Sequence, residues 1–163
     1  MRDHALAVDL GRMTETGAAT EVARAIQGAL GCARVNFWNV SGVPGRRVMS
    51  RTAGYDGRAN RVLSEPLDLH ETTGEFFRTL RETGCYVCPD TATDPNLREI
   101  FRTYLQPTAG VTMIVAAFHV DELVWGMISC VHDGVRRWTA GEITALRKCA
   151  SELSHRRARL LRA

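Results

Sequence analysis

The sequence predicts an α+β fold, an α/β sandwich with a central antiparallel sheet of five to six strands between two helical layers. The main evidence is a pair of apolar stretches, residues 112–119 and 123–131, joined by the short turn 120–122. Neither stretch alternates apolar with polar residues, so both faces of these strands are expected to be covered. Segments with helical apolar spacing lie before and after them and can supply that cover. Gly126, inside the second stretch, indicates a close backbone approach.

Size and composition fit one folded domain. The chain has 163 residues, of which 45% are hydrophobic and 24% are charged, and such a length buries a substantial core. We expect an N-terminal arm over residues 1–15 and a single domain over residues 16–163, terminal helices included. No apolar run is long enough to span a membrane, so we expect no membrane association. Five cysteines without a secretory signal indicate reduced thiols and a cytoplasmic location.

Charge and motifs argue against two classes of function. The net charge is only +3, and the arginine excess lies in the last turns of the chain rather than in a basic stripe with aromatics. We therefore expect no nucleic-acid partner. The sequence also lacks the G-x-S-x-G, H-E-x-x-H and P-loop motifs, and we expect neither catalytic residues nor enzyme activity.

The first half of the chain predicts one helix followed by strands. Apolar residues at helical spacing cover residues 16–30. Residues 34–40 and 46–53 are rich in strand formers and flank a turn that contains glycine and proline. Residues 61–69 are expected to be extended, with a break at Pro66.

The second half predicts three helices and a short strand around the hairpin. Thr72, followed by Glu three residues later, has the form of a capping box and opens a helix that ends at Gly84. Residues 85–88 form a short strand. Asp94 and the proline after it begin the next helix. Thr139 opens the final helix with a second capping box.

The final helix carries a heptad-like seam that can pair with another helix. Its apolar positions are spaced by three, four, three and seven residues, with Arg157 interrupting the pattern; they are Ile143, Leu146, Ala150, Leu153 and Leu160. We expect a homodimer formed through the terminal helices.

Two segments carry a family resemblance. They are DTATDPNLREIFRTYL, in the middle of the chain, and VDELVWGMISCVHDGVRRW followed by TAGEI, near its end. In order and spacing they resemble the middle and the end of a GAF domain, the small-ligand sensor module of signalling proteins, and the likeness runs over residues 34–153. It implies that the first and last helices pack on one face of the sheet and that the middle helices enclose a ligand on the other.

The resemblance also implies a role in signal transduction. Such a sensor relays ligand binding through its terminal helices to a partner subunit, or to a kinase or regulator output domain of a two-component system. Because side chains alternate across a strand, the ligand side is expected to carry Asn36, Trp38, Met113, Val115, Met127 and Ser129, with Tyr104 closing it from a helix. This pocket would hold a small, mostly apolar ligand non-covalently.

Three ligand classes of GAF domains find little support in the sequence. The segment LVWGMISCVHD looks most like phytochrome GAF domains, but Val131 stands where those proteins place the pigment-contacting histidine, and His132 is expected to face the terminal helices. No Cys-His pair for covalent attachment is present, so we expect no covalent bilin. The cyclic-nucleotide signature is absent, and Val115 replaces an aspartate that many relatives use. Haem needs only one histidine, such as His119 or His132, yet we do not expect it.

Two alternatives to a ligand sensor stay open. In the first, the pocket residues simply fill a core, and the domain is a ligand-free structural or dimerisation module. In the second, Cys85 and Cys88 form a Cys-x-x-Cys redox or metal sensor, although zinc normally takes four ligands. Ordinary buried thiols are the simpler interpretation of that pair.

Overall fold

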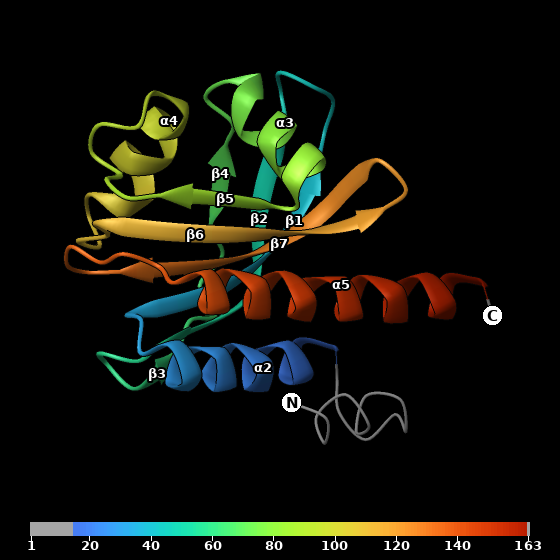
Figure 1. Ribbon diagram of the computed structural model, residues 1–163, viewed down its shortest axis with the longest axis horizontal. Helices are drawn as coiled ribbons and strands as arrows, with labels where there is room; N and C mark the ends of the chain where they lie inside the picture. Colours follow the sequence, from blue (N-terminus) through green and yellow to red (C-terminus); the bar gives the residue numbers. More distant parts are fainter. Residues whose placement is uncertain (1–14, 163) are drawn as a thin grey trace.

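An antiparallel sheet with helices on both faces forms the computed structural model, which describes residues 15–162 (Figure 1). The sheet runs in the order β3-β2-β1-β7-β6-β5, and β4 pairs with β2 beside this path. The strands are β1 (Arg34–Ser41), β2 (Val48–Asp56), β3 (Arg61–Val62), β4 (Asp68–His70), β5 (Cys85–Cys88), β6 (Thr112–Val120) and β7 (Leu123–His132). The α+β fold class is therefore confirmed. The arm expected over residues 1–15 lies almost wholly outside the described residues.

The helices also follow the predicted order. They are α2 (Glu15–Leu30), α3 (Gly74–Thr83), α4 (Arg98–Ile100) and α5 (Ala140–Arg162), with a 3₁₀ turn η1 (Pro95–Leu97) before α4 and a π-helical turn η2 (Phe101–Leu105) after it. The predicted single helix after Asp94 is thus three short pieces. Among residues 15–162, no helix combines the length and the apolarity needed to cross a bilayer.

The β6–β7 hairpin lies in the central part of the sheet, and its strands are covered on both faces as predicted. Gly126 pairs with Phe118 across the β6–β7 hairpin. A Cβ atom at this glycine would lie 2.7 Å from the Trp38 carbonyl oxygen and 2.9 Å from the Phe118 ring. The close backbone approach expected at Gly126 is confirmed, and it leaves no room for a side chain.

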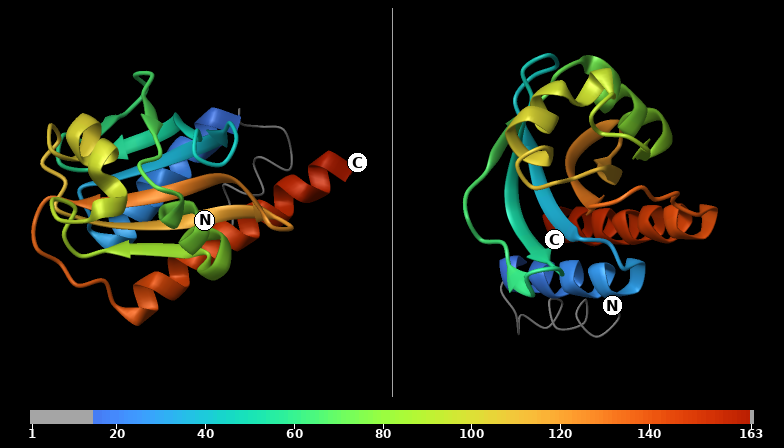
Figure 2. Two further views of the ribbon diagram at one scale, coloured as in Figure 1. Left: turned by 90° about the horizontal axis from the view of Figure 1, so that it is seen from above. Right: turned by 90° about the vertical axis from the view of Figure 1, so that its left-hand side faces the viewer.

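One face of the sheet is covered by the two long helices. Helix α2 packs on β1 and β2, and α5 packs on β6 (Figures 1 and 2). Together they bury the alternate strand residues Val35, Phe37, Ile114, Ala116, Phe118, Ile128 and Cys130. The opposite face is covered by α3 and the turns around α4 (Figure 2).

The heptad-like seam of α5 faces this sheet rather than solvent. Leu146 and Ala150 are buried in the core, and Ile143 and Leu153 pack against it. A stripe of apolar residues at three-four spacing occurs both in a helix that pairs with another helix and in one that packs on a sheet. Here the stripe packs on the sheet. The side chain of Leu160 lies outside the described residues. The seam therefore gives no evidence for a homodimer.

Three of the predicted helix ends are confirmed by their caps, and one prediction is wrong. Asp94 accepts a hydrogen bond from the backbone N–H of Asn96 at 2.9 Å, and Thr139 accepts one from the N–H of Glu142 at 3.1 Å. Gly84 ends α3 in the left-handed region, with φ +76°. The capping box at Thr72 was wrong, because α3 starts one residue later and the Thr72 hydroxyl instead accepts from the N–H of Glu99, 3.0 Å away.

Candidate functional site

The predicted ligand-side residues lie together on the face of the sheet below α3 and α4. Strand β1 contributes two of them, β6 two, β7 two and η2 one; they are Asn36, Trp38, Met113, Val115, Met127, Ser129 and Tyr104. All are at most 3% exposed. Strand alternation therefore assigned the face correctly, and we call this group the inner cluster. Whether it binds a ligand stays a prediction.

Two hydrogen bonds organise the inner cluster. The indole N–H of Trp38 donates to Ser129 Oγ at 2.8 Å, and Asn36 Nδ2 donates to the Tyr104 hydroxyl oxygen at 2.7 Å. The Trp38 and Tyr104 rings meet edge to face with centroids 5.8 Å apart. The polar groups thus form one compact unit that ties β1 to β7 and to the helical layer.

One polar atom of this unit has no partner among the described residues. Asn36 Oδ1 is buried and accepts no hydrogen bond. It points at Gly54 on β2, whose missing Cβ would lie 2.3 Å away. A flip of the amide would only exchange which of its two atoms is unpaired. Buried polar groups are normally satisfied, so the Asn36 amide has unused capacity to bind.

The outer side of the inner cluster is closed by Tyr104 and Arg51. Tyr104 lies on the π-helical turn η2, and such turns are frequent at functional sites because the chain carries one extra residue there. The Arg51 guanidinium lies 5.8 Å from the centroids of both Trp38 and Tyr104. Sequence reasoning missed Arg51. Its only signal is the pairing Trp38↔Arg51, which depends on a β-bulge at Thr52 of β2.

The structure does not bring Cys85 and Cys88 together. Cys85 packs in the core below α2 and α5, whereas Cys88 packs in the cluster on the opposite face. Three residues along a strand span roughly 10 Å, too far for a disulfide. Burial, and then a hydrogen bond to Asp94, raise the pKa of the Cys88 thiol to about 12. No group of three metal-ligating side chains occurs among the residues the structure describes. The Cys-x-x-Cys hypothesis is therefore wrong for this fold.

The two strand histidines lie away from the inner cluster. His132 follows Val131, the residue that stands where phytochrome GAF domains place their pigment-contacting histidine. Val131 is fully buried on the inner face. Burial lowers the pKa of both His119 and His132. The backbone N–H of His119 donates to Ser154 Oγ on α5 at 3.1 Å. The structure therefore does not bring either imidazole to the face where a ligand was predicted.

Comparisons with known proteins agree with this architecture. The GAF domain family model matches residues 16–156. The structure resembles the GAF domain of the cyanobacteriochrome TePixJ, with a TM-score of 0.69, 17% identity and 92% of each chain covered. It also resembles the phycocyanobilin-bound GAF domain of a cyanobacterial phytochrome, with a TM-score of 0.72, 16% identity, and 97% of this chain and 91% of that one covered.

A far-red cyanobacteriochrome photoreceptor is similar as well, with a TM-score of 0.70, 13% identity, and 98% of this chain and 97% of that one covered. No curated protein matches the sequence. The identities are low, so these structures support the fold alone. The family match extends over most of the chain, from α2 into α5. The chain therefore belongs to the GAF domain family.

Proposed function

We propose that the protein is a sensory domain that binds a small, mostly apolar molecule non-covalently at the inner cluster. The ligand would lie between the sheet and the α3–η2 layer, with apolar contacts from Met113, Val115 and Met127. The Asn36 amide and the Ser129 hydroxyl would supply the hydrogen bonds that orient it. In this proposal Tyr104 is the group that moves to admit the ligand.

The Asn36 amide carries the proposal. It is a fully buried polar group that uses one of its ends on Tyr104 and leaves the other without a partner among the described residues. A core without a ligand would be more stable with an apolar residue of similar size at this position. The π-helical turn under Tyr104 supports the same conclusion, since an alternative backbone register there would withdraw the phenol from Asn36.

A second candidate, a ligand-free structural module, is favoured by the close packing of the inner cluster. Its seven side chains are almost wholly excluded from solvent, and its apolar members belong to one contiguous buried core. In such a module the Trp38–Ser129 and Asn36–Tyr104 bonds would specify core geometry and nothing more. The two candidates differ in whether the inner cluster opens.

A bilin, which the names of the similar structures suggest, fits this cluster poorly. The position of the pigment-contacting histidine is Val131, a fully buried apolar residue packed on the inner face. Four of the five cysteines belong to the core below α2 and α5, and the fifth, Cys88, is fully buried. The described residues offer neither an accessible thiol nor an imidazole to a pigment on this face.

Signal transfer would pass through the sheet to the terminal helices. Each central strand alternates residues of the two faces, so Met127 on the inner face is followed by Ile128 in the core that α2 and α5 cover. A ligand that displaced Met127 would shift that contact, provided it bound the two arrangements with different affinity. The output would be a homodimer partner or an attached kinase or regulator domain. With the seam buried, such a partner would use the outer, polar side of α5.

The test is native mass spectrometry, with an absorbance spectrum, on the freshly purified full chain. The proposal predicts a mass-shifted species whose extra mass is released on unfolding. Trp38→Ala and Met127→Ala should reduce its occupancy, whereas Ile128→Val, the neighbouring change on the other face, should not. An unliganded protein that a panel of small aromatic compounds fails to stabilise thermally would favour the structural module instead.

A further inference from the structure

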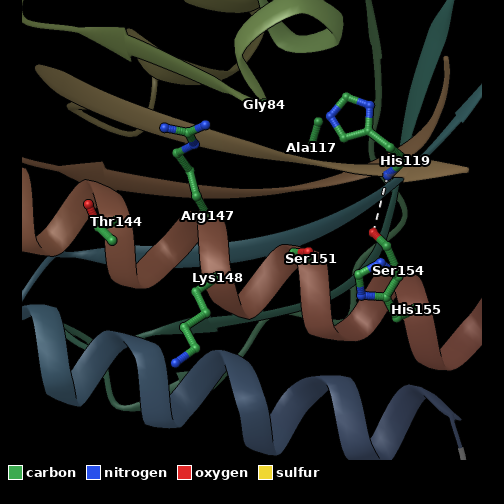
Figure 3. Close-up of a pocket in the computed structure, with 9 residues that line it drawn as sticks. All are labelled: Gly84, Ala117, His119, Thr144, Arg147, Lys148, Ser151, Ser154 and His155. Atoms are coloured by element: carbon green, nitrogen blue, oxygen red, sulfur yellow. Dashed lines mark hydrogen bonds between the residues drawn. The ribbon is translucent and has the colours of Figure 1, made fainter. Parts of the chain in front are cut away.

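A surface pocket of about 440 Å³ lies on the other side of the sheet from the inner cluster, along the flank of α5. Helix α5 supplies most of its wall, and β6 and the turn between α3 and β5 supply the rest (Figure 3). Its lining residues are Gly84, Ala117, His119, Thr144, Arg147, Lys148, Ser151, Ser154 and His155. We call it the α5 pocket. Its volume is within the range of small-molecule sites.

The α5 pocket is positively charged and rich in hydroxyl groups. Arg147 and Lys148 are basic residues, and no carboxylate lines the pocket. Neither cation forms an ion pair with a carboxylate of the described residues, although arginines elsewhere on the surface do, as Arg58 with Asp133 and Arg136 with Glu142. The positive charge of Arg147 is therefore available to a ligand.

Two nitrogen groups converge on one point of this pocket. An atom at the missing Cβ of Gly84 would lie 3.8 Å from Arg147 Nε and 3.9 Å from His119 Nε2. Figure 3 shows Arg147 extending toward Gly84, while Lys148 extends the opposite way. The glycine is required for the left-handed end of α3, where φ is +76°. It also leaves the space between the guanidinium and the imidazole empty.

The backbone around this point is already satisfied. The Gly84 N–H donates to the Leu80 carbonyl at 2.8 Å, and its carbonyl accepts from the Ala117 N–H at 3.0 Å. Ser154 Oγ accepts from the His119 N–H and donates to the Ala150 carbonyl. These bonds hold β6, α5 and the α3–β5 turn in fixed relation. The remaining side-chain donors, on Arg147 and on the hydroxyl residues of α5, line the pocket.

We propose that the α5 pocket binds a small phosphate monoester, with the phosphate between Arg147 and His119 above Gly84. A guanidinium matches the geometry of phosphate oxygens, and the hydroxyl groups of Thr144 and Ser151, which also line the pocket, can bind the rest of the ligand. The remaining volume holds the organic part of the ligand. The bound anion would join α5 to the α3–β5 turn, so it would act on the terminal helix directly. This inference is independent of the inner cluster.

The experiment is a titration of the ¹⁵N-labelled full chain with inorganic phosphate and with phenyl phosphate at constant ionic strength, followed by amide NMR shifts. Saturable shifts should appear at Gly84, His119 and Ser151. Arg147→Gln should weaken phenyl phosphate binding about tenfold, the effect of one lost charge-assisted contact. Lys148→Gln removes the same charge from the neighbouring residue of the same helix and should weaken it less than about threefold.

Three results would overturn the proposal. Shifts that stay linear in phosphate concentration would show an adventitious surface effect. Equal losses in the two variants would show diffuse attraction by the helix charge rather than a site. A phosphoserine peptide that bound at least about tenfold tighter than phenyl phosphate would assign the pocket to a protein partner instead of a metabolite. Arg147 and Lys148 are both exposed, so both variants are expected to fold.

Discussion

The indole N–H of Trp38 and the hydroxyl of Ser129 form a 2.8 Å hydrogen bond between two neighbouring central strands, with both side chains excluded from solvent. The two residues are diagonal neighbours, because Trp38 pairs with Met127 and Asn36 pairs with Ser129. A buried tryptophan needs a partner for its N–H. Ser129 thus supplies the acceptor that the buried Trp38 N–H needs, whether or not the inner cluster binds a ligand.

Replacing Ser129 by alanine should therefore destabilise the fold. The Trp38 N–H would lose its acceptor inside the core, and an unsatisfied buried donor costs about 1–3 kcal/mol. Urea unfolding measures the change in the free energy of unfolding. Ser41→Ala, at the exposed end of β1, is the matched control and should change it by less than about 0.5 kcal/mol. Equal effects of the two changes would contradict the importance of the bond.

The Asn36–Tyr104 bond should show measurable coupling in a double-mutant cycle. Tyr104→Phe leaves the Asn36 amide with no partner among the described residues, so it should cost about 1–3 kcal/mol. Adding Asn36→Leu to the Tyr104→Phe variant should recover part of that loss, because an apolar pair needs no hydrogen bond. The coupling is expected at about 1 kcal/mol by urea unfolding. Strictly additive effects would mean that the 2.7 Å contact contributes no stability.

Gly54→Ala tests the position of the free Asn36 oxygen. The added methyl would meet Asn36 Oδ1 at 2.3 Å, inside a fully buried site, and overpacking of this kind costs about 1–3 kcal/mol. The double variant Gly54→Ala with Asn36→Ala should recover most of the loss. Thermal unfolding of the two proteins is the measurement. A stable Gly54→Ala protein would place the Asn36 amide elsewhere.

Much of the fold could be predicted because its signals are local. The apolar runs of β6 and β7 required cover on both faces. Asp94 and Thr139 mark helix starts through side-chain hydrogen bonds, and Gly84 marks a helix end through its left-handed backbone. The prediction at Thr72 failed because Thr72 and Thr73 compete for the same helix start. Thr72 is used in a contact with Glu99, 27 residues away. No local pattern reports such a contact.

The face of the sheet on which the inner cluster lies could be predicted, but the way in which the cluster is closed could not. Alternation along β1, β6 and β7 gives the side on which Trp38 and Met127 lie. Closure of that side depends on the π-helical turn that carries Tyr104 and on the register that brings Arg51 over Trp38. The heptad of α5 failed for a related reason: spacing identifies an apolar stripe, but not the surface against which it packs.

The thiols should be nearly inert in the folded protein. All five are buried, and burial raises the pKa of Cys85 and raises that of Cys149 to about 11. The hydrogen bond with Cys32, and then burial, raise the pKa of Cys130. The same hydrogen bond lowers the pKa of Cys32, but that side chain is fully buried and out of reach of a reagent. Attack on a thiol reagent requires the thiolate. At pH 8, a colorimetric thiol assay should register little fast reaction in the native state and all five cysteines in guanidinium. Rapid loss of Cys85 and Cys88 together would restore the redox hypothesis.

Stability should fall as the pH drops from about 7 to about 5, before the carboxylates titrate. Burial lowers the pKa of His119 and His132 in the folded state, so the unfolded chain binds protons first as the solution is acidified. The stabilisation is present above the unfolded pKa of histidine and is lost as the pH falls toward the folded value. The lowered pKa of Asp133, caused mainly by its hydrogen bond from Arg58, affects stability only at still lower pH.

Urea midpoints at a series of pH values measure this dependence of stability on pH, and His119→Gln should make it weaker. A flat wild-type profile between pH 7 and pH 5 would show that both imidazoles titrate as they do in the unfolded chain.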